Sequence, residues 1–161
     1  MLIRQAIGMV PLSAPERRGW RWSNVPLPEP HLGLGAVAFM MNVLRPRRIT
    51  WQPSRRIGWP LIVGGVALAA GATHAAGGTA LARPDQLVSN GPYAVSRHPM
   101  YVAWTAIYLG TALVTRTTWP LLLAPLLIVL TRREIVREEK RLAEVFGSAY
   151  TAYQARVHRY V

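Results

Sequence analysis

The sequence contains no cysteine, few acidic residues and a single lysine, and each shortage narrows what the chain can be. Without cysteine it cannot form disulfides, use a thiolate nucleophile or bind zinc through thiolates. Its 161 residues include 7 acidic residues against 19 Lys and Arg, a formal charge of +12, yet 51% of them are hydrophobic. A soluble domain this short cannot bury so much apolar surface in one core. The composition therefore favours a membrane protein whose arginines lie in the headgroup layer.

Strong positive charge also occurs in nucleic-acid-binding proteins, but here its pattern argues against that partner. The arginines interrupt apolar runs instead of gathering on one polar face. No G-x-G-x-x-G motif follows a strand, as a soluble nucleotide-binding fold would require. The histidines are too scattered for a zinc site, at His31, His74, His98 and His158. We therefore predict no nucleic-acid partner and no metal.

Four apolar stretches predict an all-α, polytopic membrane protein with about four transmembrane helices, within a range of about three to five. The first, Leu32–Leu44, is too short to cross about 30 Å of hydrocarbon at 1.5 Å per residue unless it borrows flanking residues. The second, Ile57–Ala80, is long enough, and its glycines and alanines predict a closely packed inner helix. The third and fourth, Met100–Val114 and Thr118–Leu130, are separated by a tight turn and form an antiparallel hairpin.

The polar segments complete the organisation of one domain. Residues 1–30 predict an interfacial or flexible arm before a single domain over residues 31–161, and residues 132–161 predict an amphipathic helical tail with a break at Gly147. Four crossings place both termini on one face. The charge count favours the cytoplasmic face of an inner (plasma) membrane, with 13 Lys and Arg there against 6 on the other side. The arginine-rich loop 45–56 fits poorly, because positive charge in short loops resists translocation.

Two polar clusters interrupt this pattern, and the first is residues 87–101, which read LVSNGPYAVSRHPMY. Asn-Gly-Pro predicts a turn, and Pro99 marks the start of the third helix. Arg97 and His98 therefore stand at a helix N-terminus, where backbone N–H groups and an arginine suit an anion such as a carboxylate. Arg, His and aromatic residues form membrane-interface anchors equally well. This cluster alone does not decide between function and anchoring.

The second cluster, residues 134–153, holds four of the seven acidic residues in an otherwise basic tail. A solvated helix with Glu–Arg or Glu–Lys pairs one turn apart would account for it. A carboxylate near the membrane could instead hold ribose hydroxyls or offset the positive sulfur of a bound cofactor. The spacing alone favours the solvated helix.

The two clusters, in this order and separated by a helical hairpin, resemble the isoprenylcysteine carboxyl methyltransferase and phospholipid methyltransferase superfamily. The first reads GPY-x3-RHP-x-Y and the second EE-x2-L-x3-FG-x2-Y-x2-Y-x3-V-x-R. The resemblance covers about residues 57–161. The residues that carry it are Gly91, Pro92, Tyr93, Arg97, His98, Pro99 and Tyr101, then Glu138, Glu139, Leu142, Phe146, Gly147, Tyr150, Tyr153, Val157 and Arg159.

The resemblance implies an integral membrane enzyme that transfers a methyl group from S-adenosyl-L-methionine to a lipophilic or membrane-embedded acceptor. It places the cofactor where residues 87–101 meet the folded-back tail. The implied cofactor contacts are Gly91, Tyr93, His98, Pro99, Tyr101, Glu138, Glu139, Tyr150 and Tyr153. The implied catalytic residues are Arg97, His98 and Glu139, and the implied substrate contacts are Arg97 and Arg159. The family's closing Arg-aromatic-x-Pro is incomplete, because this chain reads Arg159-Tyr160-Val161.

The sequence leaves the acceptor atom open. A carboxylate needs a cation such as Arg97 to position it, whereas an amine or alcohol needs a base, for which His98 or a glutamate is available. A thiol could use either route. The expected partners are a lipophilic or lipidated substrate and membrane lipids. Two rival functions remain: a reductase of the sterol-reductase type, which would bind NADPH, and a non-catalytic membrane lipid-binding protein, which would not bind S-adenosylmethionine.

Overall fold

The computed structural model describes residues 29–77 and 86–160, and within these ranges the regular structure is helical. The helices are α1 (Glu29–Leu44), α2 (Ser54–Ala76), the short 3-10 helix η2 (Gly91–Ala94), α3 (Pro99–Thr115) and α4 (Trp119–Arg156). The predicted all-α class is confirmed. The predicted N-terminal arm lies outside the described residues, except that Glu29 and Pro30 are the first residues of α1.

The largest difference from the predicted elements is in α4. This helix continues through the predicted end of the last apolar stretch at Leu130, so that stretch and the first part of the tail are one helix. The arginines and glutamates that follow are good helix formers, so the helix continues where the hydropathy stops. α2 ends at Ala76 instead of Ala80, because Gly77 leaves the helical conformation with a φ of +57°.

Among the described residues, only α2 is long and apolar enough to cross a membrane, judged by length and composition. α1 has 16 residues and α3 has 17, both short of the roughly 20 that a spanning helix needs. The polytopic arrangement therefore stays a prediction. Four helices are nevertheless present, and α3 joins α4 through a tight turn in which Arg116 has a φ of +58°.

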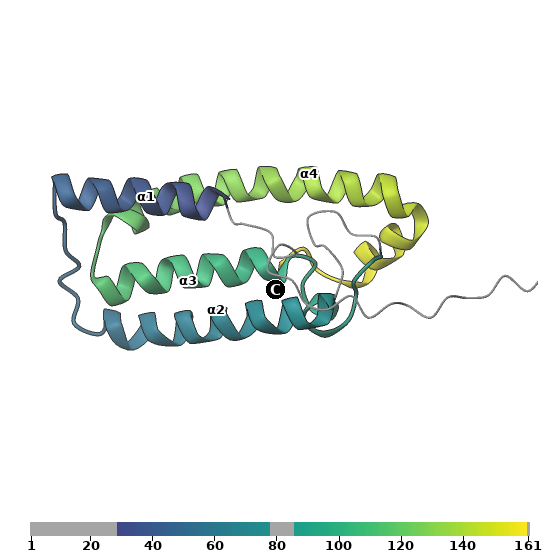
Figure 1. Ribbon diagram of the computed structural model, residues 1–161, viewed down its shortest axis with the longest axis horizontal. Helices are drawn as coiled ribbons and strands as arrows, with labels where there is room; N and C mark the ends of the chain where they lie inside the picture. The colour runs from purple at the N-terminus through teal and green to yellow at the C-terminus, as the bar shows by residue number, and fades with distance from the viewer. Residues whose placement is uncertain (1–28, 78–85, 161) are drawn as a thin grey trace, which may run out of the picture.

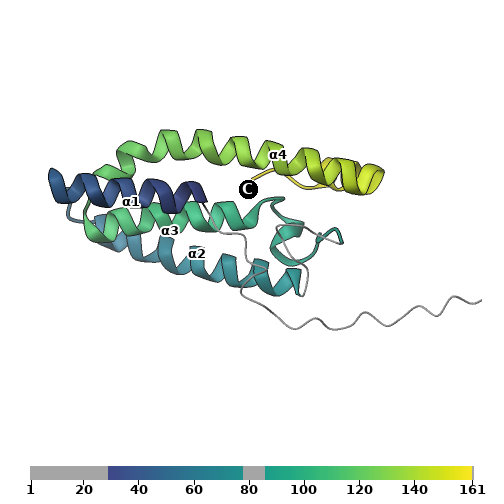
Figure 2. The same ribbon diagram turned by 45° about the horizontal axis from the view of Figure 1, so that its top comes forward.

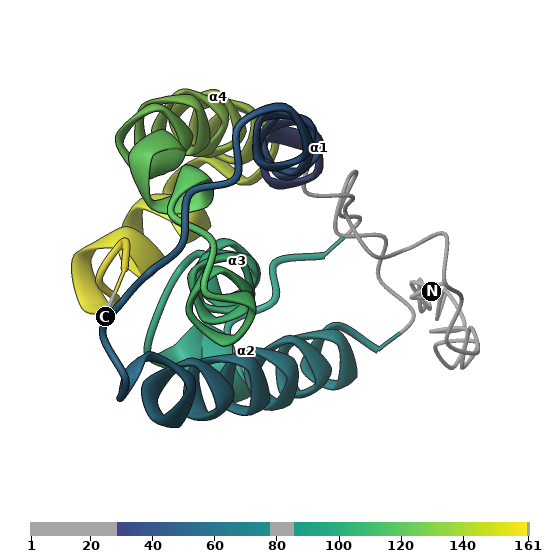
Figure 3. The same cartoon turned by 90° about the vertical axis from the view of Figure 1, so that its left-hand side faces the viewer.

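The helices form two layers, α2 with α3 and α1 with α4 (Figure 1). The end-on view places α3 between α2 and the other layer (Figure 3). Figure 2 shows α1 alongside the first half of α4, with the second half of α4 extending beyond it. A small apolar core of Leu34, Tyr108 and Leu127 joins α1, α3 and α4.

The contact between α2 and α3 depends on glycine. A Cβ added to Gly58 or Gly65 would lie 2.8 Å from a backbone oxygen of α3, and one added to Gly110 would lie 2.7 Å from a backbone oxygen of α2. Gly58 and Gly65 are seven residues apart and so share one helix face. The predicted close packing is present, but α2 is not an inner helix, since only 17% of its apolar segment is buried. Its other faces carry exposed apolar side chains, including Trp59, Val63 and Val66.

The far end of α4 turns back at Gly147 and returns toward α3 (Figure 1). Gly147 has a φ of +51° and a ψ of −124°, a conformation that glycine adopts without a Cβ clash, which confirms the predicted break. The returning chain pairs with the segment before α3. Ser96 and His158 form a parallel bridge, and the Arg97 N–H donates to the His158 carbonyl at 2.9 Å. This reversal brings both polar clusters together.

Candidate active site

A partly open cavity lies where residues 86–101 meet the second half of α4 and the returning tail. The empty space between its walls is ≈ 600 Å³ when the open mouth is included, but the centre of a water molecule can move within only ≈ 60 Å³. The interior is therefore narrow. Its walls are apolar, aromatic and charged, formed by Gln86, Leu87, Val88, Tyr93, Arg97, His98, Pro99, Met100, Tyr101, Glu138, Leu142, Tyr150 and Tyr153.

The structure brings together most of the residues that the resemblance implied. Three of them do not line the cavity: Gly91, Glu139 and Arg159. Gly91 has a φ of +56° in η2, and a Cβ there would lie 3.0 Å from the Cβ of Ala75, so its backbone and its packing on α2 both favour glycine. Four apolar wall residues were not singled out as contacts from sequence: Leu87, Val88, Met100 and Leu142. All four lie inside the two polar clusters, and Leu142 is also one of the residues that carry the resemblance.

Glu139 is the centre of a buried ion cluster. Its carboxylate pairs with Arg97 Nη2 at 3.0 Å and Arg159 Nη2 at 2.7 Å, and it contacts His98 Nε2 at 3.3 Å. The Glu139 side chain is 8% exposed. Burial alone would raise its pKa, but the hydrogen bonds from Arg159 and His98 and the charge of Arg97 hold the pKa below its usual value. Glu139 is therefore ionised and ties the tail to the segment before α3.

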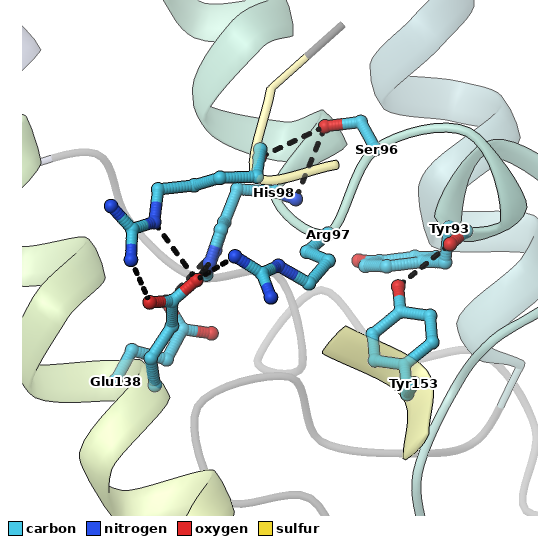
Figure 4. A network of polar contacts seen from close by, with 8 residues as sticks. Tyr93, Ser96, Arg97, His98, Glu138 and Tyr153 are labelled. Atoms are coloured by element: carbon cyan, nitrogen blue, oxygen red, sulfur yellow. Dashed lines mark hydrogen bonds and ion pairs between the residues drawn. The ribbon is translucent and has the colours of Figure 1, made fainter. Parts of the chain in front are cut away.

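His98 is buried and neutral near pH 7. Burial lowers its pKa to about 4, although the neighbouring Glu139 acts in the opposite direction. Because an ionised Glu139 can only accept, the hydrogen-bond pattern assigns the proton of the neutral ring to Nε2. Nδ1 then keeps its lone pair and lies 3.8 Å from Oε2 of Glu138. Figure 4 shows Arg97, His98 and Glu138 meeting in this network.

Glu138 is adjacent to Glu139 in sequence but has a different environment. It lines the cavity and keeps 37% of its side-chain surface exposed. Burial in the cavity wall raises its pKa to about 7, since a hydrogen bond with Tyr101 offsets only part of this effect and the charge of Glu139 adds to it. The exposed part of the Glu138 side chain faces the narrow cavity and not bulk solvent. The carboxyl is therefore poorly solvated although it is partly exposed.

The tyrosines of the wall remain neutral at physiological pH. The Tyr153 hydroxyl donates to the Tyr93 carbonyl at 2.6 Å and fastens the tail to η2 (Figure 4). Burial raises the pKa of Tyr150 and of Tyr153 to about 12 and raises the pKa of Tyr93 as well. These side chains therefore supply aromatic surface and hydroxyl hydrogen bonds, while Glu138 is the wall residue that titrates near neutral pH.

The two neighbouring carboxylates therefore have different roles. Glu139 holds the site together, whereas Glu138 can exchange a proton. A carboxyl with a pKa near ambient pH in a cavity is a candidate general base. Arg97 adds a buried Nε with no hydrogen-bond partner among the described residues. An unpaired buried donor on a cationic side chain suits an anionic group of a ligand.

Comparison with known protein families identifies the family of this chain. The phospholipid methyltransferase family matches residues 54–149, more than half of the sequence. The chain belongs to that family. This confirms the superfamily predicted from the two polar clusters, with a match that begins at α2 and stops two residues beyond Gly147. No curated protein and no solved structure matches.

Membership of the phospholipid methyltransferase family places the chain in a class of membrane-associated methyltransferases. The matched residues include both the segment before α3 and the pair Glu138 and Glu139. Tyr150, Tyr153 and Arg159 lie beyond the matched range, although the first two line the same cavity. The family therefore accounts for the core of the site and leaves its closing segment to be explained by the structure.

Proposed function

We propose that this phospholipid methyltransferase family member transfers a methyl group from S-adenosyl-L-methionine to an amine of a membrane lipid. The observation that carries the proposal is Glu138, a carboxyl with a pKa of about 7 in the wall of the cavity. An amine acceptor must lose a proton, whereas a carboxylate acceptor need not. A titrating carboxyl in the cavity therefore favours the amine.

The cavity residues fit the cofactor by their chemistry. The unpartnered Nε of Arg97 offers a donor to a carboxylate, and the rings of Tyr93 and Tyr101 suit a planar base or a cation. Glu138 suits either ribose hydroxyls or a neighbouring positive charge. When bound, S-adenosyl-L-methionine supplies a methyl group on a positively charged sulfur. Because the interior is narrow, a ligand of this size would have to extend into the open mouth.

The chain's own residues divide the remaining work. Glu138 accepts the proton that the acceptor nitrogen gives up as the methyl group is transferred. The Nδ1 lone pair of His98 lies 3.8 Å from Oε2 of Glu138, which is beyond hydrogen-bond distance, so the two groups must approach each other before His98 accepts from the protonated carboxyl. Glu139 and Arg159 are positioning residues, since they hold Arg97 and His98 without lining the cavity. The apolar walls exclude water from the reaction.

The lipid acceptor reaches the cavity through an apolar groove between α3 and α4. Tyr101 lines both this groove and the cavity, and Thr105 and Thr131 lie along the groove. Large apolar side chains are exposed on α1, α2 and α4 outside this groove, which fits contact with lipid, among them Val43, Trp59, Val63 and Leu122. We therefore propose several spans in an inner membrane, with the cavity and both termini on the cytoplasmic face.

Methyl transfer into vesicles that contain phosphatidylethanolamine tests this function. The full-length protein is incubated with methyl-labelled S-adenosylmethionine, and label is expected on the lipid amine. Glu138→Gln is expected to lower labelling about a hundredfold or more, because a general base contributes that much. Cofactor binding, measured by equilibrium dialysis, should fall much less, because glutamine keeps a polar side chain in the cavity wall. Glu134→Gln removes an exposed carboxylate from the same helix and should change the rate far less, because the charge of Glu134 is the smallest of the effects on the pKa of Glu138.

Other outcomes identify the rival functions. Label recovered as a methyl ester or thioether, or full activity in E138Q, would overturn the amine acceptor. Absence of S-adenosylmethionine binding would overturn the enzyme and favour a membrane lipid-binding protein. NADPH binding in its place would favour a reductase of the sterol-reductase type.

A further inference from the structure

The end of the helix bundle opposite the cavity carries six arginines and, within residues 29–77 and 86–160, no acidic residue. The described glutamates lie instead at the start of α1 and in α4 from Glu134 onward. This end, at the left of Figure 1, joins the α1–α2 loop to the α3–α4 turn. Its arginines are Arg45, Arg47, Arg48, Arg55, Arg56 and Arg116.

The arginine-rich end is an ordered platform built from two loops. The Ile49 N–H donates to the Arg116 carbonyl at 2.8 Å, and the Thr118 N–H donates to the Arg47 carbonyl at 3.1 Å. The Arg116 side chain crosses between the loops and donates to the carbonyls of Ile49 and Thr50 at 3.1 and 3.2 Å. Arg116 does so from a φ of +58°, which is uncommon for a residue with a side chain. The backbones of the two loops and the Arg116 side chain are therefore held in place.

Three of these arginines, Arg48, Arg55 and Arg116, line one shallow polar cleft. Nε of Arg55 donates to the Val114 carbonyl at 3.1 Å, while Arg116 uses Nε and one Nη on the facing loop. A guanidinium has five N–H donors, so both side chains keep donors for a ligand. Guanidinium groups with free donors and no facing carboxylate suit a phosphate.

Arg48 also lines a second, mostly apolar groove between α1 and α3. Ala38 and Phe39 of α1 and Ala112 of α3 form part of its wall. This groove is wider than the active-site cavity, since the centre of a water molecule can move within ≈ 420 Å³ of it. A cationic cleft and an apolar groove therefore meet at one arginine.

We propose that this end of the protein binds an anionic phospholipid, with its phosphate on Arg48, Arg55 and Arg116 and an acyl chain in the α1–α3 groove. The arginines of the cleft suit an anion, and the shared Arg48 allows the same molecule to place an apolar part in the groove. A bound anionic lipid also neutralises the arginines of the short α1–α2 loop. The site is separate from the methyltransferase cavity and depends only on the membrane location proposed above.

Lipid titration of the full-length protein in detergent tests the site. The unfolding temperature is followed as phosphatidylglycerol or zwitterionic phosphatidylcholine is added. Arg48→Gln and Arg55→Gln are expected to raise the half-saturating phosphatidylglycerol concentration about fivefold, as expected for loss of one cation near a lipid phosphate. Arg45→Gln and Arg56→Gln remove exposed arginines that do not line the cleft. These two variants should leave the half-saturating phosphatidylglycerol concentration unchanged.

Equal weakening in all four variants would show diffuse attraction and overturn a defined site. Equal stabilisation by phosphatidylcholine would also overturn it, and so would saturation by inorganic phosphate at the same concentration. Circular dichroism establishes that R48Q and R55Q are folded. S-adenosylmethionine binding should persist in R48Q, so this proposal and the methyl-transfer proposal fail independently.

Discussion

The two ends of the helix bundle hold their arginines in opposite ways. At the cavity end, Arg97 and Arg159 converge on the buried carboxylate of Glu139. At the other end, Arg55 and Arg116 donate to backbone carbonyls, and the described residues there offer no carboxylate. A buried cation must be paired, whereas an arginine held at the surface by carbonyls keeps its charge uncompensated. We therefore infer that one end uses arginine to assemble a site and the other uses it to bind a ligand.

Removing the central carboxylate should have the largest effect on this contrast. Glu139→Gln leaves Arg97 and Arg159 without their counter-charge, and breaking a buried pair costs about 3–5 kcal/mol. We expect a loss of about 3 kcal/mol, because Arg159 is 37% exposed and can regain water. The measurement is unfolding by denaturant in detergent.

The exposed pair of Glu134 and Arg137 provides the control for that measurement. Its side chains are 43% and 64% exposed, so Glu134→Gln should cost less than about 1 kcal/mol. Equal losses in E139Q and E134Q would show that the buried cluster does not stabilise the protein, and the contrast between the two ends would disappear.

A smaller effect is expected from the glycine contact that connects the two ends. Gly65→Val places a Cβ 2.8 Å from the Ala103 carbonyl, and overpacking of this kind costs about 1–3 kcal/mol. The helices α2 and α3 would separate, which should weaken both cofactor binding and lipid binding. Gly64→Val has open space around its Cβ and is the matched control. If G65V bound both the cofactor and the lipid as the wild type does, the two ends would not depend on the contact between α2 and α3.

The smallest effect concerns the dependence of stability on pH. The pKa of Glu138 rises from 4.5 to about 7 on folding, so the folded state binds its proton more tightly. This stabilisation is complete below pH 4.5 and is lost as the pH rises to about 7. The free energy of unfolding of Glu138→Gln relative to the wild type should therefore increase over that interval.

Measuring the difference between E138Q and the wild type separates Glu138 from His98, which acts in the opposite direction. The pKa of His98 falls from 6.5 to about 4 on folding, so its contribution decreases as the pH falls through that range. Partial exposure of Glu138 keeps the effect small. A difference that stays constant between pH 4.5 and 7 would contradict the raised pKa and remove the argument for a base.

The helices were largely predictable from the sequence because apolar runs of helical length can hardly form anything else in this composition. α4 shows the limit of that reasoning. The end of hydropathy at Thr131 marks where a membrane could end, while the helix continues because the next residues have high helix propensity. The one-sided packing of α2 was also missed, since a stripe of glycines predicts close contact without saying how many neighbours make it.

Within the site, the order of the motifs predicted which residues meet, but it did not predict how they divide the work. Glu138 and Glu139 are neighbours, and successive residues on a helix point about 100° apart. Which of them faces the cavity depends on the path of the returning tail. Leu142 belongs to the second motif, but its place in the cavity wall could not be predicted. The same holds for Met100, because an apolar residue in a cavity wall looks the same in sequence as one that faces lipid.

The reversal at Gly147 has a consequence for how such sites are recognised. Glycine has no side chain that could contact a ligand. Its backbone angles nevertheless turn the chain so that Tyr150 and Tyr153 come near His98. Alanine here would favour continuing the helix straight, and every motif residue would remain while the enclosure was lost. Two proteins can therefore share all the polar residues of this site and still differ in whether the site forms. The difference would lie in the backbone conformation of the residue at this one position.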